Sequence, residues 1–350
     1  MRYLTIDLVQ EGMRVGKTIF NEQGVVLLNA NAVLTRATID RLEFLGYKGL
    51  LIEDEISQDI EYYENFVSNE VKFSLAKKLN NAILVNADSN KLYKEIDNLR
   101  SMISELIDEM LSKRDLNLNL LELKMFDNYT YFHSVNVAII SLAIAYHLKM
   151  NKADLLTVGT AALLHDIGKI CVGTEILNKP GKLTEEEYEI MKTHSKKGYD
   201  ILSNGNNLSV KATVSVLSHH EHYDGSGYPN GLAGENILLF GRIICIADVY
   251  DALTSDRPYR KGCSVLEAIE YIMANSGSLF DPELVTLFVS KINPYPVGSS
   301  VRLSNGEIGL VVNNSDKLCL RPKIKLIEEN RVVDLFNDKD YLSIVITGLL

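Results

Sequence analysis

The sequence has few cysteines, and no two of them are closely spaced. The four cysteines are spread along the 350 residues, at Cys171, Cys245, Cys263 and Cys319. A disulfide framework or a zinc knuckle needs pairs at short, regular intervals, so neither is expected. This pattern is typical of reduced core cysteines in a cytosolic protein.

Long hydrophobic runs and an excess of positive charge are also missing. The longest apolar stretch, residues 135–146, is too short to span a bilayer, and the first residues lack the basic and apolar regions of a signal peptide. The net charge is −10, so broad attraction to a nucleic-acid polymer or an anionic membrane is not expected. We therefore predict a cytoplasmic protein that binds neither, and that would meet an anionic substrate through local cations or metal.

Two common catalytic motifs are absent as well. The chain has no Gly-x-Ser-x-Gly elbow, which argues against a Ser-His-Asp hydrolase, and no P-loop. What it has is an ordinary globular composition, with 46% hydrophobic and 23% charged residues. Its length is enough for two or three domains.

Hydrophobic patterning divides the chain into four regions. Short β-like runs around one helix predict a small α+β module over residues 1–55, and residues 56–115 form an acidic linker followed by a helical stalk. Residues 116–292 are almost entirely helical by pattern, and an Asn-Gly turn signal favours a small β-rich module over residues 293–350. The predicted fold class is mainly α, with an all-helical domain between two small modules. Its predicted helices are residues 116–150, 152–165, 184–204, 209–222, 239–254 and 264–274.

The stalk carries apolar residues at a 4-3-4-3-4 spacing: Leu92, Ile96, Leu99, Ile103, Leu106 and Met110. This spacing is typical of a coiled-coil seam, but it covers fewer than three heptads. Two interpretations stay open, a helix packed on the next domain and a zipper that joins a homodimer. Both would make residues 92–110 a signalling stalk between the first region and the third. Signalling partner proteins are a separate expectation.

Six of the seven histidines lie between positions 133 and 220, and two aspartates share their neighbourhood. Imidazoles with a few carboxylates suit divalent Mn, Fe or Zn better than Mg or Ca. The candidates exceed the four ligands of one tetrahedral ion, so we predict two ions that share a carboxylate. The candidate ligands are His133, His165, Asp166, His194, His219, His220 and Asp248.

Each candidate taken singly also has a structural explanation. A lone histidine on an amphipathic helix, such as His133 or His194, is more often a hydrogen-bonded core residue. The adjacent His219 and His220, and Asp248 inside an apolar run, are harder to explain without a metal, because buried polar groups need partners. Taken together, the seven residues indicate a metal site.

Two further segments could contact a ligand. Residues 224–231 contain three glycines and a proline, which predicts a tight loop with exposed backbone around Tyr228. Arg257 and Arg260 supply local cations, and a guanidinium group matches phosphate oxygens. Alone, each would be a plain surface turn; beside a metal site they indicate a phosphate-bearing nucleotide.

The motifs together resemble the HD-GYP subgroup of the HD phosphohydrolase superfamily. The resemblance spans about residues 120–290 and rests on His165-Asp166 with Lys169, His219-His220-Glu221, the loop at 224–229 and the segment 247–260. It implies an all-helical domain that hydrolyses the phosphodiester bond of cyclic di-GMP to pGpG, or on to GMP, and so lowers a bacterial second messenger. The alternatives are an HD phosphohydrolase acting on another cyclic dinucleotide or nucleotide, and a non-catalytic cyclic di-GMP receptor.

The resemblance also implies a role for each site residue. One divalent ion, Fe or Mn, would take His133, His165, Asp166 and Asp248, and a second would take His194, His219 and His220, with Asp166 bridging. Asp166 and Lys169 would be catalytic. Tyr129 stands where some relatives carry a glutamate for a third ion, which argues for two ions here. The implied substrate-binding residues are Lys169, Gly227, Tyr228, Asp251, Arg257 and Arg260.

Overall fold

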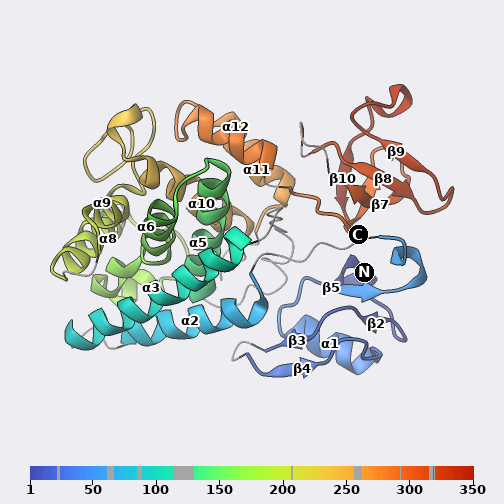
Figure 1. Cartoon of the computed structure of the whole chain (residues 1–350), viewed down its shortest axis with the longest axis horizontal. Coiled ribbons are helices and arrows are strands. Elements are labelled where there is room, and N and C mark those ends of the chain that lie inside the picture. The colour runs from blue at the N-terminus through green and yellow to red at the C-terminus, as the bar shows by residue number, and fades with distance from the viewer. Residues whose placement is uncertain are drawn as a thin grey trace. The chain divides into compact units, whose positions relative to one another are not determined.

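The computed structural model describes most of the chain (Figure 1). The described residues are 1–21, 24–60, 67–84, 89–112, 130–205, 208–255, 262–291, 293–314, 318 and 320–350. The chain folds into two compact units. The first contains residues 1–65, 117–128 and 289–350, and the second contains residues 66–116 and 129–288. Both ends of the chain therefore belong to the same unit.

A small antiparallel sheet and one helix form the N-terminal part of the first unit. Its elements are β1 (Arg2–Thr5), η1 (Ile6–Leu8), β2 (Arg14–Val15), β3 (Ile19–Phe20), β4 (Val26–Leu28), α1 (Arg36–Phe44), β5 (Gly49–Glu53) and η2 (Glu55–Ser57). The sheet has the order β1-β5-β2, and β3 pairs with β4. Thr35 caps α1, whose Ile39 and Leu42 pack with Leu4 and Leu50 in one core. The predicted α+β module is confirmed.

A five-stranded antiparallel sheet forms the C-terminal part of the first unit. Its strand order is β10-β6-β7-β8-β9. Its elements are β6 (Ser300–Leu303), β7 (Ile308–Asn313), β8 (Lys323–Leu326), β9 (Val332–Asp334), η5 (Lys339–Tyr341) and β10 (Ile346–Leu349). Gly306 closes the β6–β7 turn with a φ of 91°, as the Asn-Gly pair predicts. The predicted β-rich module is confirmed.

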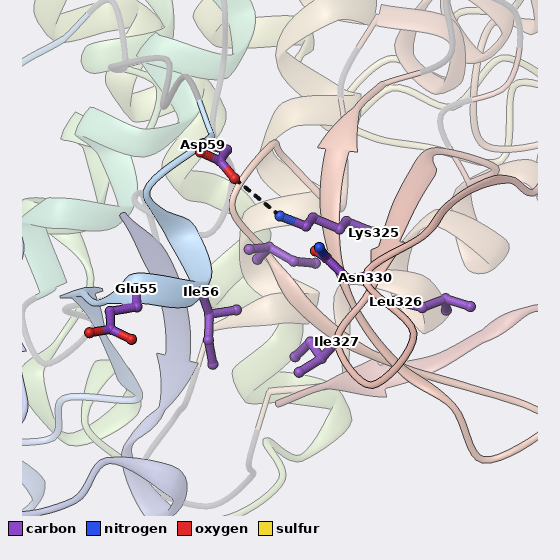
Figure 2. Close-up of a pocket in the computed structure, with 8 residues that line it drawn as sticks. Glu55, Ile56, Asp59, Lys325, Leu326, Ile327 and Asn330 are labelled. Carbon is purple, nitrogen blue, oxygen red and sulfur yellow. Dashed lines mark hydrogen bonds and ion pairs between the residues drawn. The ribbon is translucent and has the colours of Figure 1, made fainter.

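Backbone and side-chain contacts join these two parts of the first unit. The amide of Tyr3 donates to the carbonyl of Gly298 at 2.8 Å. Lys325 Nζ lies 3.4 Å from a carboxylate oxygen of Asp59, at a pocket of about 310 Å³ whose walls come from both parts (Figure 2). Segments at opposite ends of the sequence thus build one unit.

The second unit is helical, and its described residues contain no strand longer than an isolated bridge. None of the helices in the described part of the chain is long and apolar enough to cross a membrane. The mainly α fold class is confirmed. The elements are α2 (Asn69–Leu84), α3 (Ser89–Ser112), α5 (Thr130–His147), α6 (Lys152–Leu163), η3 (Ile167–Cys171), α7 (Thr174–Leu177), α8 (Glu185–Ser203), α9 (Val210–Ser218), η4 (Gly234–Asn236), α10 (Leu239–Thr254), α11 (Val265–Ala274) and α12 (Pro282–Lys291).

Several predicted helix boundaries differ from the structure. The helix predicted over residues 152–165 ends at Leu163, and the one predicted over residues 209–222 ends at Ser218. Both predictions extended the helix past its observed end, into segments that contain the buried His165 and His219. Helix α12 had not been predicted. The capping box that begins α8 is present, with Thr184 and Glu187 bonding reciprocally. Residues 116–129 of the first predicted helix lie outside the described part of the chain.

The apolar seam of α3 is buried inside the chain. Leu92, Ile96, Leu99, Ile103, Leu106 and Met110 are each at most 4% exposed. Helix α3 packs against α2 and α6, which supply the apolar surface that a second copy would otherwise provide. The seam is thus covered within the chain, as the packing interpretation predicts.

We expect Leu99→Ala to lower the free energy of unfolding by about 2–5 kcal/mol, because it leaves a cavity in a packed core. Leu111→Ala on the same helix, where the side chain is 44% exposed, should change it by less than about 0.5 kcal/mol. Urea unfolding measures both. If the loss for Leu99→Ala instead shrank as protein concentration rose, the seam would lie between copies.

Candidate metal centre

Five segments of the second unit bring the seven predicted ligands together. His133 lies on α5, His165 and Asp166 lie in the turn between α6 and η3, and His194 lies on α8. His219 and His220 follow the end of α9, and Asp248 lies on α10. Within each of three groups the ligand atoms lie within 4.8 Å of one another: His194 with His219 and His220, His133 with His165 and Asp166, and His165 with His219 and Asp248.

The carboxylate of Asp166 lies between two sets of histidines. Its Oδ2 is 3.3 Å from Nε2 of His165 and 3.8 Å from Nε2 of His133. Its Oδ1 is 3.5 Å from Nε2 of His194. The two oxygens of one carboxylate thus face different imidazoles, which is the arrangement that a bridging carboxylate requires.

Asp248 approaches the same rings from α10. Its Oδ1 lies 3.1 Å from Nε2 of His133 and 3.8 Å from Nε2 of His165. Its Oδ2 lies 4.0 Å from Nδ1 of His220. The side chain is only 12% exposed, so this charge is placed in the interior next to imidazoles and largely away from water.

Three histidines are fixed by the same local hydrogen bond. The Nδ1–H groups of His165, His194 and His219 each donate at 2.7 Å to the backbone carbonyl three residues earlier. This bond sets the tautomer and leaves the lone pair of each Nε2 facing the cluster. The buried Nε2 of His165 has no hydrogen-bond partner among the described residues.

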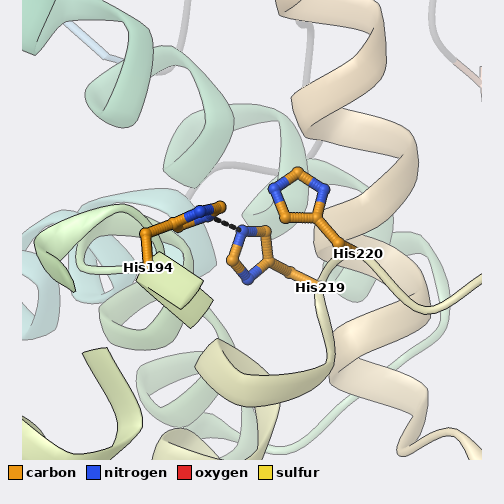
Figure 3. A group of neighbouring side chains, drawn as sticks. All are labelled: His194, His219 and His220. Carbon is orange, nitrogen blue, oxygen red and sulfur yellow. Dashed lines mark hydrogen bonds between the residues drawn. The ribbon is translucent and has the colours of Figure 1, made fainter. Parts of the chain in front are cut away.

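The Nε2 atoms of His194 and His219 lie 3.3 Å apart (Figure 3). With both Nδ1 atoms donating, two lone pairs face each other at this distance and would repel unless a cation lies near both. An unpaired buried acceptor costs about 1–3 kcal/mol. The imidazole and carboxylate donors therefore fit a divalent ion of the Mn, Fe or Zn type.

Electrostatics keep most of the donors ready for a cation. Burial, followed by the charges of neighbouring histidines, holds the pKa of His219 well below its usual value, and burial lowers the pKa of His220 to about 3. Burial alone would raise the pKa of Asp166, but His165 and Lys169 hold it well below its usual range. These two imidazoles are neutral and this carboxylate is ionised at neutral pH.

His133 is the exception. Burial acts to lower its pKa, but the hydrogen bonds that it donates to Asp248 and Asp251, with the charges of those carboxylates, outweigh burial and raise it to about 9. Its Nδ1 donates to Asp251 Oδ2 at 2.7 Å, and Ser255 Oγ donates to the same oxygen at 3.2 Å. Asp251 was predicted to bind substrate, yet its side chain is fully buried behind His133.

Lys169 reaches the cluster through a turn and not through a continued helix. Its Nζ lies 2.6 Å from Asp166 Oδ2, three residues away in η3, whereas the sequence had suggested the helical face of His165. Gly168 makes this approach feasible, since a Cβ there would lie 2.0 Å from the carbonyl oxygen of His194. The turn is thereby packed directly against α8.

The loop after α9 forms one rim of the cluster. The ring of Tyr228 stacks on that of His220, with centroids 4.7 Å apart and an interplanar angle of 29°. The Tyr228 amide donates to the His220 carbonyl at 3.1 Å. A Cβ at Gly227 would lie 2.3 Å from the His222 nitrogen, so only glycine allows the loop to come this close. Both predicted loop residues therefore lie at the site.

Two residues that were not predicted as site residues also lie beside the cluster. Lys192 Nζ lies 5.8 Å from the centre of the Tyr228 ring, and it precedes His194 by two positions. Glu221 is 1% exposed and directly follows the His219-His220 pair, which was the one signal for it. Of the remaining predicted residues, Arg257, Arg260 and Tyr129 lie outside the described part of the chain.

The comparison with family models decides the relationship. A model described as an HD domain matches residues 105–284, just over half of the chain. The chain belongs to the HD domain family. The membership predicted from the histidine and aspartate motifs is confirmed.

Two relatives that are named as phosphodiesterases are similar to this chain. Cyclic di-GMP phosphodiesterase PA4108 of Pseudomonas aeruginosa is 42% identical over 227 residues, which cover 64% of this chain and 55% of that protein. The 3′3′-cGAMP-specific phosphodiesterase 3 of Vibrio cholerae is 39% identical over 170 residues, covering 48% of this chain and 36% of that protein. The chain thus spans about half the length of the first relative and about a third of the second.

Bd1817, an HDG"Y"P protein from Bdellovibrio bacteriovorus, superposes with a TM-score of 0.54 at 13% identity. The match covers 81% of this chain and 97% of that one. At this identity the likeness shows a shared fold. The fold therefore includes more of the chain than the HD domain alone.

We expect Mn(II) binding to the metal-free protein to release about one proton at pH 7, because His133 with a pKa near 9 is then protonated and must lose the proton from Nε2. Below that pKa the proton competes with the ion, so apparent affinity should rise about tenfold per pH unit between pH 7 and 8. Calorimetry in two buffers of different ionisation enthalpy measures the proton count.

Asp251→Asn provides the comparison, since it removes one partner that raises the His133 pKa and should reduce the proton release at pH 8. A binding enthalpy that is the same in both buffers would contradict this account of the site.

Proposed function

We propose that the protein hydrolyses a phosphodiester bond of cyclic di-GMP to give linear pGpG, and GMP if a second bond is cleaved. The observation that carries the proposal is the Asp166 carboxylate between two sets of inward-facing imidazole Nε2 atoms. The named activity of the Pseudomonas relative supports the choice of substrate. With divalent ions bound, a buried cluster beside an aromatic rim would suit a diester that carries planar bases.

We assign two divalent ions, Fe or Mn, to this cluster. His133, His165, Asp166 and Asp248 would hold one, and His194, His219 and His220 would hold the other with Asp166 shared; two of the observed groupings of ligand atoms support this division. When bound, the ions supply Lewis acidity to the phosphoryl oxygens and lower the pKa of a nucleophilic water.

Protein side chains supply the remaining functions. The Lys169 ammonium, paired with Asp166 at 2.6 Å and 35% exposed, can stabilise negative charge that develops on the phosphoryl group or donate a proton to the departing 3′ oxygen. Gly227 and Tyr228 provide a surface on which a base can stack. Arg257 and Arg260 are proposed to hold phosphate oxygens.

We propose a different role for Asp251 from the substrate contact that the sequence suggested. Its carboxylate accepts from the Nδ1–H of His133, so it would orient that ring and keep Nε2 directed at the cluster. Its full burial behind His133 supports this role.

We also propose that residues 116–292 carry the catalysis and that the modules at residues 1–55 and 293–350 are accessory. Residues 56–115 would then link an input to the catalytic region. The pocket at Asp59 and Lys325 lies within the accessory unit and not at the cluster.

A second candidate substrate is 3′3′-cGAMP, which the name of the Vibrio relative favours. A substrate panel read by chromatography distinguishes the two dinucleotides. A non-catalytic receptor would need no bridging carboxylate, so the arrangement around Asp166 argues against it.

We expect Asp166→Ala to abolish both metal content and turnover of cyclic di-GMP, because the residue contacts both sets of histidines. Protein purified without oxygen and loaded with Mn(II) or Fe(II) is analysed for metal, and its products are resolved by chromatography. Asp200→Ala, at an exposed carboxylate on α8, should leave both unchanged. Full turnover by Asp166→Ala would overturn the assignment.

Lys169→Met should lower kcat by about 10²–10³-fold while the metal content stays at the wild-type level, since the ammonium acts on developing charge and not on ligand donation. Lys196→Met, an exposed lysine on α8, serves as the matched control. A kcat equal to that of the wild type would remove Lys169 from the mechanism.

A further inference from the structure

A buried carboxylate, Glu221, closes the loop beside the metal cluster. Glu221 lies directly after His219 and His220, and it is 1% exposed. Its Oε1 accepts from the amide of Asn230 at 2.8 Å, and its Oε2 accepts from the amide of Leu232 at 2.9 Å. Each oxygen therefore holds one backbone group on the far side of the loop.

These bonds explain why Glu221 does not serve as a metal ligand although it adjoins His220. Both of its oxygens accept hydrogen bonds from backbone N–H groups of the loop, and these bonds orient the carboxylate toward the loop. The side chain faces the loop and not the cluster. Its role must be sought in what the loop carries.

The loop carries the aromatic rim. Between Glu221 and its two bonding partners lies Tyr228, whose ring stacks on His220 and whose amide donates to the His220 carbonyl at 3.1 Å. The base of the loop is closed separately, since Asp224 forms a bridge with Ala233. Glu221 thus links the His219-His220 side of the loop to its Asn230 to Leu232 side through two side-chain hydrogen bonds.

We propose that Glu221 is a positioning residue that sets the Tyr228 ring as the wall against which a purine base of the substrate stacks. The identity of the substrate rests on the proposed function. The clamp, by which we mean the two hydrogen bonds from the amides of Asn230 and Leu232 to Glu221, does not depend on it. Removing one of the two bonds lets the Asn230 to Leu232 segment move and the ring with it. Recognition of the dinucleotide then weakens, while the metal cluster remains intact.

Glu221→Gln is the sharpest test, because it keeps the shape and one acceptor but turns an N–H donor toward a backbone N–H. Glu235→Gln makes the same chemical change at an exposed position just after the loop and is the control. Hydrogen exchange of the peptide amides at 226–234 should become faster in Glu221→Gln only. Unchanged exchange would overturn the clamp, whatever the substrate proves to be.

Two substrates separate positioning from damage to the cluster. For cyclic di-GMP, we expect KM of Glu221→Gln to rise roughly tenfold, as the loss of one hydrogen bond predicts, with a smaller change in kcat. For methyl p-nitrophenyl phosphate, which carries no purine and only one small ring, turnover and metal content should stay close to those of the wild type. Equal loss on both substrates together with lost metal would overturn the positioning role.

A double-mutant cycle tests whether Glu221 acts through Tyr228. If it does, adding Glu221→Gln to Tyr228→Leu should raise KM for cyclic di-GMP by less than twofold, because the ring that the clamp places is already gone. Fully additive effects would overturn the link. Absence of any cyclic di-GMP hydrolysis by the wild type would refute the proposed function, and the exchange measurement would still decide the clamp.

Discussion

The site depends on three buried imidazoles, each of which donates its Nδ1–H to a carbonyl of its own backbone segment. Because His165, His194 and His219 donate to a carbonyl three residues earlier, each ring is oriented by a single turn of its own segment. The Nε2 lone pairs are then left facing one another in the interior, at 3.3 Å in one case. Such acceptors are costly without a partner, so the cluster is poised for a cation and less stable without one.

The carboxylates complete this arrangement by supplying negative charge where the imidazoles supply lone pairs. Asp166 and Asp248 contact the rings from different elements. Asp251 holds His133 from behind, and Lys169 holds Asp166 at 2.6 Å. Because five of the seven ligands have a partner outside the cluster, most of the ligand geometry is set before any ion enters.

Much of this site could be predicted from the sequence, because ligand identity depends on chemistry and not on where a helix ends. His165 and His219 were predicted on helices that end before them, yet they still reach the cluster. Lys169 was expected on a helical face and instead arrives through a 3-10 turn. The seam of α3 was ambiguous since the same spacing suits burial within a chain and pairing between chains. The joining of β1 to residue 298 depends on contacts nearly 300 residues apart, and no local pattern encodes it.

Under the proposed function, metal binding and base recognition would fall to different parts of the fold. A cluster that contacts a phosphodiester group meets the same chemistry in every cyclic dinucleotide, so it cannot distinguish one base from another. Discrimination has to come from the rim, and there Tyr228 is held through backbone bonds to His220 and through the loop that Glu221 closes. Because those bonds involve backbone amides, loop side chains other than that of Gly227 can change while the bonds to Glu221 persist. Under the proposed function, the rim could then vary with the base while the ligands of the cluster stay the same.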